Sequence, residues 1–290
     1  MADSLREVKT RIESTKNTAQ ITKAMYMVSQ SKVKRSEKTY TEYQSFMDNI
    51  RSIVKSVVVK ASDDYKHPLM QDREINKIGY LLITSDKGLA GAYNANVFKT
   101  LENDIKKNNI SPDNIIVSAV GKKGYSYITK KKYNTLNEGP VLVRDDVMFG
   151  DIVPLTEKLV KAYLNHKIDT LVIVYNHFVN TLTQETTWLP LLPIKEVGGE
   201  ANGVDYEFES GIETTLDRLL PQYIEDMIYG VILDAKTCEH CSRMNSMRNA
   251  TDNAEDVIGK LQLLYNRARQ NVITNELIDI IGGANAIGGK

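Results

Sequence analysis

The fold of this 290-residue chain is decided by its opening stretch, residues 4–59, SLREVKTRIESTKNTAQITKAMYMVSQSKVKRSEKTYTEYQSFMDNIRSIVKSVVV. The stretch contains no proline, which removes a backbone donor, and no glycine, which costs about 1 kcal/mol inside a helix. We therefore expect one uninterrupted helix over residues 4–59. A second stretch, residues 222–281, has no proline and only two glycines, and Gly282 with Gly283 indicates where a second long helix ends.

Both helices are too long to be buried in a globule. Sixty helical residues extend about 90 Å, whereas a compact chain of this length is about 50 Å across. Each helix needs a partner, and both carry apolar residues at alternating spacings of three and four, the pattern of a coiled-coil seam. We expect antiparallel pairing, with a phase break in the first helix and a C-terminal helix longer by about a dozen residues. The stripes are Leu5, Val8 and Ile12; Ile21, Met25 and Val28; Tyr40, Tyr43, Met47, Ile50, Val54 and Val57; and Val257, Leu261, Leu264 and Ala268.

The middle of the chain has a different pattern, in which short apolar runs alternate with helical segments. Strands are expected at 78–84, 115–120 and 171–175, and an extended segment at 188–194. Such alternation predicts a parallel, Rossmann-like sheet. The fold class is therefore α/β, with a Rossmann-like central domain plus a long antiparallel coiled coil. Its predicted parts are an N-terminal coiled-coil helix over 1–60, an α/β domain over 75–195 and a C-terminal helix over 210–290 that pairs with 1–60.

Composition excludes several classes of protein. Lysine and arginine together number 37, as do aspartate and glutamate, so overall charge gives no argument for nucleic acid. The first helix is basic, which is typical of a solvated face or of an acidic protein partner. No run approaches the roughly 20 apolar residues that span a bilayer. Cys238 and Cys241 are too few for a disulfide framework.

Three features resemble ligand sites. The turn 85–94, SDKGLAGAYN, lies where a Rossmann fold binds phosphate, but Gly88 and Gly91 do not make G-x-G-x-x-G. The C-terminal GGANAIGGK lacks the first glycine and the hydroxyl residue of a P-loop. Cys238-Glu239-His240-Cys241 has half the ligands of a zinc site and no second half. We expect no catalytic residue, cofactor or metal, and small residues at a close helix contact for the two cysteines.

Three segments resemble one family. They are RIESTKNTAQITKAMYMVSQSKVKRSE at 11–37, ITSDKGLAGAYNANV at 83–97 and SRMNSMRNATDNAEDVIGKLQLLYNRARQNVITNELIDIIGGA at 242–284. Together they resemble the gamma subunit of F-type ATP synthases, and the order helix, domain, helix matches that family along the whole chain. The resemblance implies a non-catalytic central-stalk rotor that couples proton-driven rotation to ATP synthesis or hydrolysis. The implied partners are the alpha and beta subunits of an alpha3-beta3 ring, the epsilon subunit and the c-ring.

The resemblance also assigns roles to particular residues. Met25 matches a methionine that meets an acidic lever of beta, with Lys23 in its basic rim, and Arg243 matches an arginine that faces this methionine across the coiled coil. Arg269 and Gln270 match a pair that contacts a beta loop, and Thr274 and Glu276 continue that region. An apolar bearing tip is implied at Val272, Ile273, Leu277, Ile278, Ile280 and Ile281.

Two other functions stay open at this stage. One is a nucleotide-dependent enzyme built on the α/β domain, and the other is a coiled-coil scaffold that does not rotate. The two thiols also leave a redox response open. The start of the chain lacks a transit-like segment, so we expect a peripheral protein on the cytoplasmic face of a bacterial plasma membrane, attached only through its complex.

Overall fold

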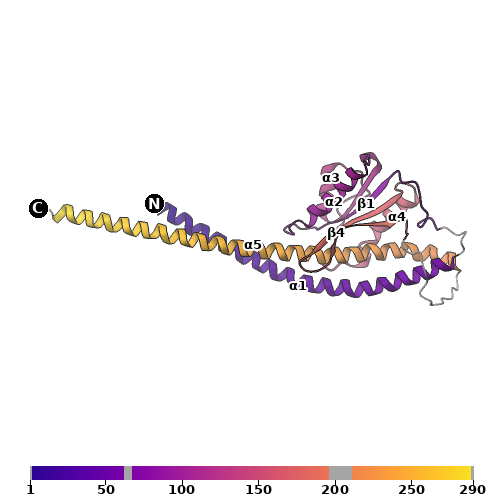
Figure 1. Cartoon of the computed structure of the whole chain (residues 1–290), viewed down its shortest axis with the longest axis horizontal. Helices are drawn as coiled ribbons and strands as arrows, with labels where there is room; N and C mark the ends of the chain where they lie inside the picture. The colour runs from indigo at the N-terminus through magenta and orange to yellow at the C-terminus, as the bar shows by residue number, and fades with distance from the viewer. Residues whose placement is uncertain (1, 62–66, 196–210, 289–290) are drawn as a thin grey trace. The chain divides into compact units, whose positions relative to one another are not determined.

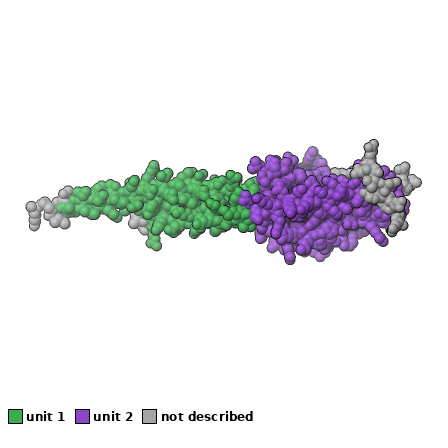
Figure 2. All heavy atoms as spheres, turned by 90° about the horizontal axis from the view of Figure 1, so that it is seen from below, with its two compact units in different colours: residues 1–29, 244–290 green, residues 30–243 purple. Residues whose placement is uncertain are grey.

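The computed structural model describes residues 2–61, 67–195 and 211–288, and this part of the chain forms two compact units. One unit comprises residues 1–29 and 244–290, and the other comprises residues 30–243 (Figure 2). Two long helices, α1 (Ala2–Lys60) and α5 (Ile212–Gly288), each contribute to both units. The predicted parts 1–60, 75–195 and 210–290 follow the helices and the sheet, not these compact units, and that division stays a prediction.

The second unit is built on a four-stranded sheet of order β2-β1-β3-β4. Strands β1 (Ile78–Ile83), β2 (Ile115–Val120) and β3 (Thr170–Phe178) are parallel, whereas β4 (Gln184–Leu192) pairs antiparallel with β3. The Rossmann-like prediction is confirmed for the three parallel strands. The sheet as a whole is mixed, because the short connection 179–183 cannot form the long crossover that a parallel strand needs.

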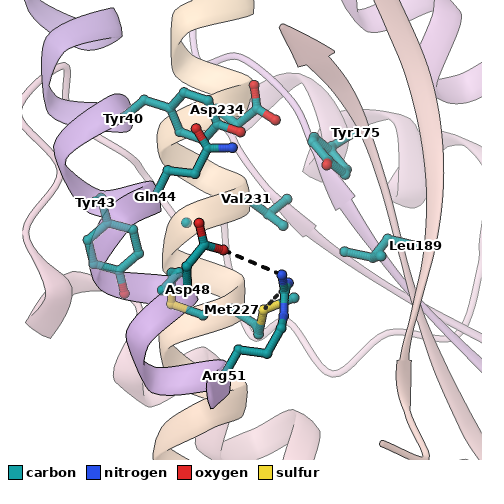
Figure 3. Close-up of a pocket in the computed structure, with 12 residues that line it drawn as sticks. Tyr40, Tyr43, Gln44, Asp48, Arg51, Tyr175, Leu189, Met227, Val231 and Asp234 are labelled. Carbon is teal, nitrogen blue, oxygen red and sulfur yellow. Dashed lines mark hydrogen bonds and ion pairs between the residues drawn. The ribbon is translucent and has the colours of Figure 1, made fainter. Parts of the chain in front are cut away.

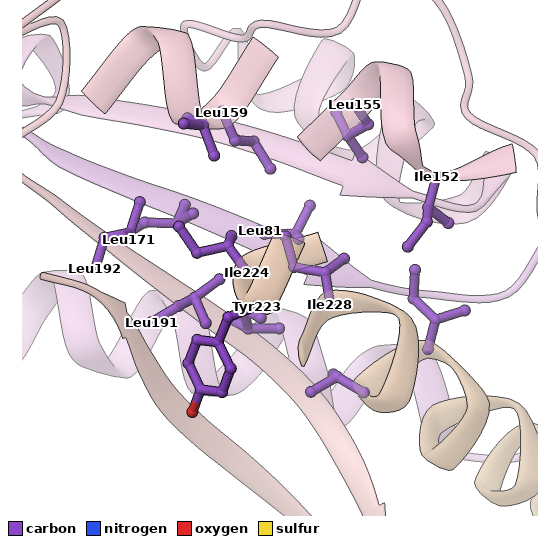
Figure 4. Packing of buried hydrophobic residues seen from close by; sticks show 14 of the residues in the cluster. Leu81, Ile152, Leu155, Leu159, Leu171, Leu191, Leu192, Tyr223, Ile224 and Ile228 are labelled. Atoms are coloured by element: carbon purple, nitrogen blue, oxygen red, sulfur yellow. The ribbon is translucent and has the colours of Figure 1, made fainter. Parts of the chain in front are cut away.

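Helices cover both faces of the sheet. Helices α2 (Tyr93–Lys107) and α3 (Lys122–Lys131) pack on the face to which Tyr80 and Leu82 point, away from α5 (Figure 1). The alternate residue Leu81 points to the other face, where α4 (Val153–Leu164) and α5 lie. There Leu155 and Leu159 of α4 meet strand residues and the α5 residues Ile224 and Ile228 (Figure 4). The second face of the sheet is therefore closed by a long helix that the chain itself supplies.

Helix α5 is longer at both ends than the predicted 222–281. It begins at Ile212 and includes Pro221, which removes one backbone bond and costs about 3 kcal/mol in a helix interior. Burial of neighbouring side chains offsets this cost, since Leu216, Leu220 and Ile224 are at most 1% exposed. At the other end the helix continues through Gly282 and Gly283 to Gly288, so the predicted stop is wrong. Glycine weakens a helix but, unlike proline, keeps its backbone donor.

In the first unit, α1 and α5 pair through a heptad seam. Their register is set by a hydrogen bond of 2.8 Å between the hydroxyl groups of Thr22 and Thr251. The seam positions of α1 are Leu5, Val8, Ile12, Thr15, Ala19, Thr22, Tyr26 and Ser29, and those of α5 are Met247, Thr251, Ala254, Ile258, Leu261, Tyr265, Ala268 and Val272, all buried or half-buried. Spacings of three and four continue without interruption along both helices, which defines a regular coiled coil.

Part of the predicted seam was therefore wrong. Ile21 and Val28 are 61% and 55% exposed, and Val257 and Leu264 are 43% and 53% exposed. The expected phase break does not occur, because the seam passes one position away from these residues, through small and polar ones. Small seam residues such as Ala19 and Ala254 let the helices approach closely, and hydroxyl groups pair inside the seam. These four apolar residues face outward, whereas Leu5, Val8, Ile12, Leu261 and Ala268 lie in the seam as predicted.

In the second unit the predicted stripe of α1 is confirmed. Met47, Val54 and Val57 are buried, and Tyr40, Tyr43 and Ile50 pack against the same hydrophobic cluster. The Cβ that Gly230 lacks would lie 3.2 Å from the Tyr43 ring, so glycine allows a close approach of α5 to α1 here. The residues of α5 from Val231 to Cys241 are all buried, although we expected only modest burial beyond Cys238.

Candidate interaction site

The C-terminal end of α5 presents a row of exposed apolar side chains. The register at Thr22 and Thr251 places Ala2, the first residue of α1, level with about residue 271 of α5. Beyond that level Ile273, Leu277, Ile278, Ile280 and Ile281 are between 43% and 67% exposed, and Val272 is half-buried. Contiguous exposed apolar side chains mark an interaction site in a soluble protein. The described structure thus leaves the implied bearing tip exposed.

The polar residues assigned by resemblance lie on the same part of α5. Arg269, Gln270, Thr274 and Glu276 are all exposed. They alternate along the helix with the apolar residues of the tip. At 3.6 residues per turn the two sets interleave around the helix, so a partner that surrounds this end would meet apolar and polar side chains together.

A second outward surface lies on α1 around Met25. Met25 is half-buried at the edge of the seam, and Lys23 beside it is exposed. Ile21 and Val28 lie one turn away on either side and are the exposed apolar residues that sequence had assigned to the seam. An apolar stripe with basic neighbours is suited to an acidic helix that also carries apolar side chains.

Arg243 has partners other than those implied by the resemblance. Its Nη2 atom lies 2.8 Å from Oε1 of Glu239, and its guanidinium donates to the carbonyl oxygens of Lys87 and Gly88 at 3.4 Å. In the first unit Met25 follows Thr22 by three residues, so the antiparallel register places Arg248 level with it. Arg248 is exposed, whereas the side chain of Arg243 is only 11% exposed. The structure therefore brings Arg243 to the turn after β1.

The N-terminus of α3, at the same end of the sheet as the turn after β1, has its backbone donors taken by the chain itself. Each backbone N–H of the first turn of α3 has an acceptor: Lys122 donates to Oδ1 of Asp86 at 3.0 Å, Lys123 to the Ser85 carbonyl at 3.1 Å and Gly124 to Oγ1 of Thr84 at 2.8 Å. These are the donors that would otherwise bind an anion. Asp86 thus supplies the negative charge that the helix N-terminus favours.

The glycines of this region serve packing and turns. Gly121 has φ +95°, and a Cβ there would lie 2.2 Å from the Thr84 carbonyl oxygen. Gly91 has φ 54°, a conformation that favours glycine, although Leu89 in the same turn also has a positive φ. The space around Gly88 is nearly open, so a side chain would fit there. The expectation that the turn glycines are structural therefore rests on Gly91 and not on Gly88. The glycine that sequence reasoning missed is Gly121, whose backbone touches the strand next to it.

Helix α5 also covers the carboxyl end of the sheet. The hydroxyl of Tyr93, the first residue of α2, donates to the Ala235 carbonyl of α5 at 3.0 Å, and both residues are buried. Asn176 at the end of β3 donates its Nδ2 to the Tyr93 carbonyl at 2.9 Å. Ligands of doubly wound folds bind at this end of the strands. Here a helix and its hydrogen-bond partners take part of that space, and a cavity of about 480 Å³ beside them is lined by Asp86, Lys87, Lys236 and Glu239 among others.

Both cysteines are buried, and the close helix contact expected for them stays a prediction. Cys238 and Cys241 are free thiols at 0% exposure, and Sγ of Cys241 donates to the Thr181 carbonyl at 3.0 Å. Burial raises the pKa of both thiols, which disfavours the reactive thiolate. Among the described residues no cluster of three or more His, Cys, Asp or Glu side chains could hold a metal ion. No helix within the described ranges is long and apolar enough to cross a bilayer.

Sequence reasoning missed the buried charges of α5. Asp234, Lys236 and Glu239 are at most 6% exposed, and Lys236 pairs with Glu239 at 2.9 Å. Residues three or four apart on a helix can pair, so the spacing allowed these contacts. They were not predicted because α5 was expected to be a coiled-coil helix whose charged side chains face solvent. The available signal was the absence of a polar face between residues 231 and 241, where apolar and small residues surround each charge.

Comparison with known proteins agrees with these features. A family model described as ATP synthase matches residues 4–287. The ATP synthase gamma chain of Macrococcus caseolyticus (strain JCSC5402) is 42% identical over 288 residues, which are 98% of this chain and 99% of that protein.

Two solved assemblies share the fold. One chain of the Tetrahymena thermophila mitochondrial ATP synthase central stalk and c-ring is 22% identical with a TM-score of 0.58, covering 79% of this chain and 99% of that chain. One chain of the Euglena gracilis mitochondrial ATP synthase OSCP/F1/c-ring assembly is 17% identical with a TM-score of 0.67, covering 100% of this chain and 96% of that chain. With a family match over nearly its whole length and a relative 42% identical, this chain belongs to the ATP synthase gamma subunit family.

Proposed function

We propose that the chain is the central-stalk rotor of an F-type ATP synthase on the cytoplasmic face of a bacterial plasma membrane. Its partners are an alpha3-beta3 ring around the paired ends of α1 and α5, and the epsilon subunit and c-ring at the α/β domain. The chain itself carries no reaction: it transmits rotation between proton transport and ATP synthesis or hydrolysis. No cofactor is required for this role.

The observation that carries the proposal is the exposed apolar end of α5. Val272, Ile273, Leu277, Ile278, Ile280 and Ile281 form the bearing tip inside an apolar sleeve of the ring. Their exposure supports this role because so many large apolar side chains are not left in water without a partner. Contacts of this kind are non-directional, so they hold the tip on the axis without fixing one angle.

The polar surfaces supply the contacts that depend on angle. Arg269, Gln270, Thr274 and Glu276 meet a beta loop, and Lys23 with Met25 meets the acidic lever of beta. Arg243 belongs to the same set by resemblance, and its pairing with Glu239 keeps it at the turn after β1 until such a partner approaches. Exposed ion pairs contribute about 1 kcal/mol or less, which suits contacts that must break at every step.

The hydrogen bonds that the chain makes with itself at the strand ends disfavour the rival enzyme. A nucleotide would have to displace Asp86 from the α3 N-terminus and Tyr93 from α5. Equilibrium binding of ATP to the isolated chain separates the two functions: a rotor subunit of this kind binds none.

Rotation itself is tested in the assembled complex. A visible probe is attached to the exposed Lys99 region of α2, and the chain is assembled with alpha and beta subunits that are fixed to a surface. On addition of ATP we expect stepwise turning of the probe. Full ATP hydrolysis with a stationary probe would refute the rotor and leave the non-rotating scaffold.

A further inference from the structure

Asp234 joins three elements of the second unit through one buried carboxylate. It lies on α5 and is 2% exposed. Its Oδ1 accepts the backbone N–H of Phe178 at 2.8 Å, and its Oδ2 accepts Nδ1–H of His177 at 2.6 Å. Both donors lie at the end of β3, so one side chain of α5 binds the sheet at two adjacent points.

The third element is α1. Tyr40 of α1 lies beside Asp234 (Figure 3), and burial together with the neighbouring Asp234 carboxylate raises the pKa of the Tyr40 hydroxyl. Burial likewise raises the pKa of Asp234, and the bonds from His177 and Phe178 counteract that effect. The carboxylate therefore has partners on β3 and a neighbour on α1 that favour its charged form.

Apolar packing is incomplete at this junction. A pocket of about 200 Å³ lies between α1, α5 and strands β3 and β4 (Figure 3). Tyr40, Gln44, Tyr175, Leu189, Val231 and Asp234 are among its lining residues. Elsewhere the face of the sheet against α5 is filled mainly by aliphatic side chains, with a few buried tyrosines. Next to the pocket, polar bonds replace part of the apolar contact.

Polar and apolar contacts resist twisting differently. Hydrophobic burial is non-directional, so a helix held only by aliphatic side chains loses little when it rotates slightly about its axis. Hydrogen bonds weaken steeply when their angle changes. A carboxylate that uses both oxygens on adjacent groups of β3 therefore fixes the rotational setting of α5 against the sheet.

We propose that Asp234, with His177 and Tyr40, is a torsional lock that makes α1, α5 and the α/β domain turn as one body. The inference rests on the proposed rotor function, since only a rotor transmits torque through this junction. Asp234 acts as a positioning residue. It touches no reacting group, and it sets the angle between the α/β domain and the helices α1 and α5.

The test uses complete ATP synthase in sealed vesicles and, in parallel, single complexes with a probe on the α/β domain. Asp234→Leu removes both bonds to β3. Asp234→Asn keeps an oxygen for the Phe178 N–H and loses the charge. The control is Lys161→Ala, which breaks an exposed pair with Glu157 at 2.8 Å on α4 of the same unit.

Three quantities are measured: ATP hydrolysis, protons pumped per ATP hydrolysed, and the angular width of the probe when the beta subunits are held by a non-hydrolysable nucleotide. Since bonds to a carboxylate are about twice as strong as neutral ones, we expect the angular variance to rise up to about twofold in Asp234→Asn and by a larger factor in Asp234→Leu, which removes both bonds. Protons pumped per ATP fall in the same order, while hydrolysis continues at the control rate.

The outcomes separate the two levels of the proposal. If unmodified complexes do not rotate, the rotor function fails. If unmodified complexes rotate and Asp234→Leu keeps the control's angular width and pumping ratio, the lock is refuted. Where Asp234→Leu fails to assemble, His177→Phe removes one bond from the surface side and is judged by the same three measurements.

Discussion

Replacing Asp86 by alanine tests whether this carboxylate takes the place of an anion at the N-terminus of α3. The change removes the acceptor of the Lys122 N–H at 3.0 Å and of the Val143 N–H at 3.3 Å, and it takes the negative charge away from the N-terminus of α3. A bond to a charged acceptor contributes about 1.5 kcal/mol at its lower range, and the helix dipole about 0.5 kcal/mol. Since Asp86 is half-buried, we expect a net loss of about 2 kcal/mol.

Thermal unfolding of the full chain measures the loss. For a unit of this size, 2 kcal/mol corresponds to a fall in melting temperature of about 4 to 8 °C. Asp86→Asn keeps an oxygen acceptor and should lose less. Asp113→Ala, the same deletion at an exposed carboxylate, is the matched control and should melt like the unmodified chain.

Phosphate supplies the second arm of the experiment. In Asp86→Ala the N-terminal amides of α3 no longer have the carboxylate, so added phosphate should raise the melting temperature of this variant more than that of the control at equal ionic strength. An unchanged melting temperature in Asp86→Ala, or an equal phosphate effect in Asp86→Ala and Asp113→Ala, would refute the idea that Asp86 takes the place of an anion at the α3 N-terminus.

Three further perturbations act elsewhere in the chain. Burial lowers the pKa of His240 from 6.5 to about 4, so between these pH values the unfolded chain binds a proton that the folded chain does not. The free energy of unfolding should therefore decrease from pH 6.5 toward pH 4. In urea unfolding at several pH values, His240→Leu should depend less on pH. Thr22→Val and Thr251→Val should each speed amide exchange in residues 12–29, whereas the double variant should cost less than their sum, as measured by mass spectrometry. Leu277→Ser combined with Ile278→Ser should change the stability of the isolated chain by less than about 0.5 kcal/mol, because both are exposed, yet reduce co-purification with alpha and beta subunits.

Local patterns were sufficient to predict the three parallel strands and the presence of two long helices. Strand β2 has the predicted bounds, Ile115–Val120, because a continuous apolar run flanked by polar residues leaves few alternatives. Helix α1 has the expected extent within two residues at each end, since no breaker interrupts it. The direction of β4 was not predicted, because it depends on the connection 179–183 and not on the strand's own residues.

The seam shows where hydrophobicity alone is misleading. Ile21 and Val28 are the more apolar choice, but Thr22 and Ser29 one position away continue the heptad that begins at Leu5. Pairing geometry over the whole helix decided the register, not the local apolar content. The role of Asp234 was equally out of reach, because its partners His177 and Phe178 are more than fifty residues away in sequence.

The hydrogen bonds at the strand ends and the buried charges of α5 have a common physical origin. A parallel sheet followed by helices creates donors at its carboxyl end, and these donors must be satisfied by a ligand, by water or by the chain. Here Asp86 accepts the first backbone N–H of α3, and the Tyr93 hydroxyl donates to the Ala235 carbonyl of α5. The preceding residue of α5, Asp234, accepts the Phe178 N–H of β3. The edge that other Rossmann folds use to hold a nucleotide therefore holds a helix of the same chain. A domain mounted on its own helix through directional bonds can pass a twisting force to that helix, which a domain bound through a loose apolar contact could not do.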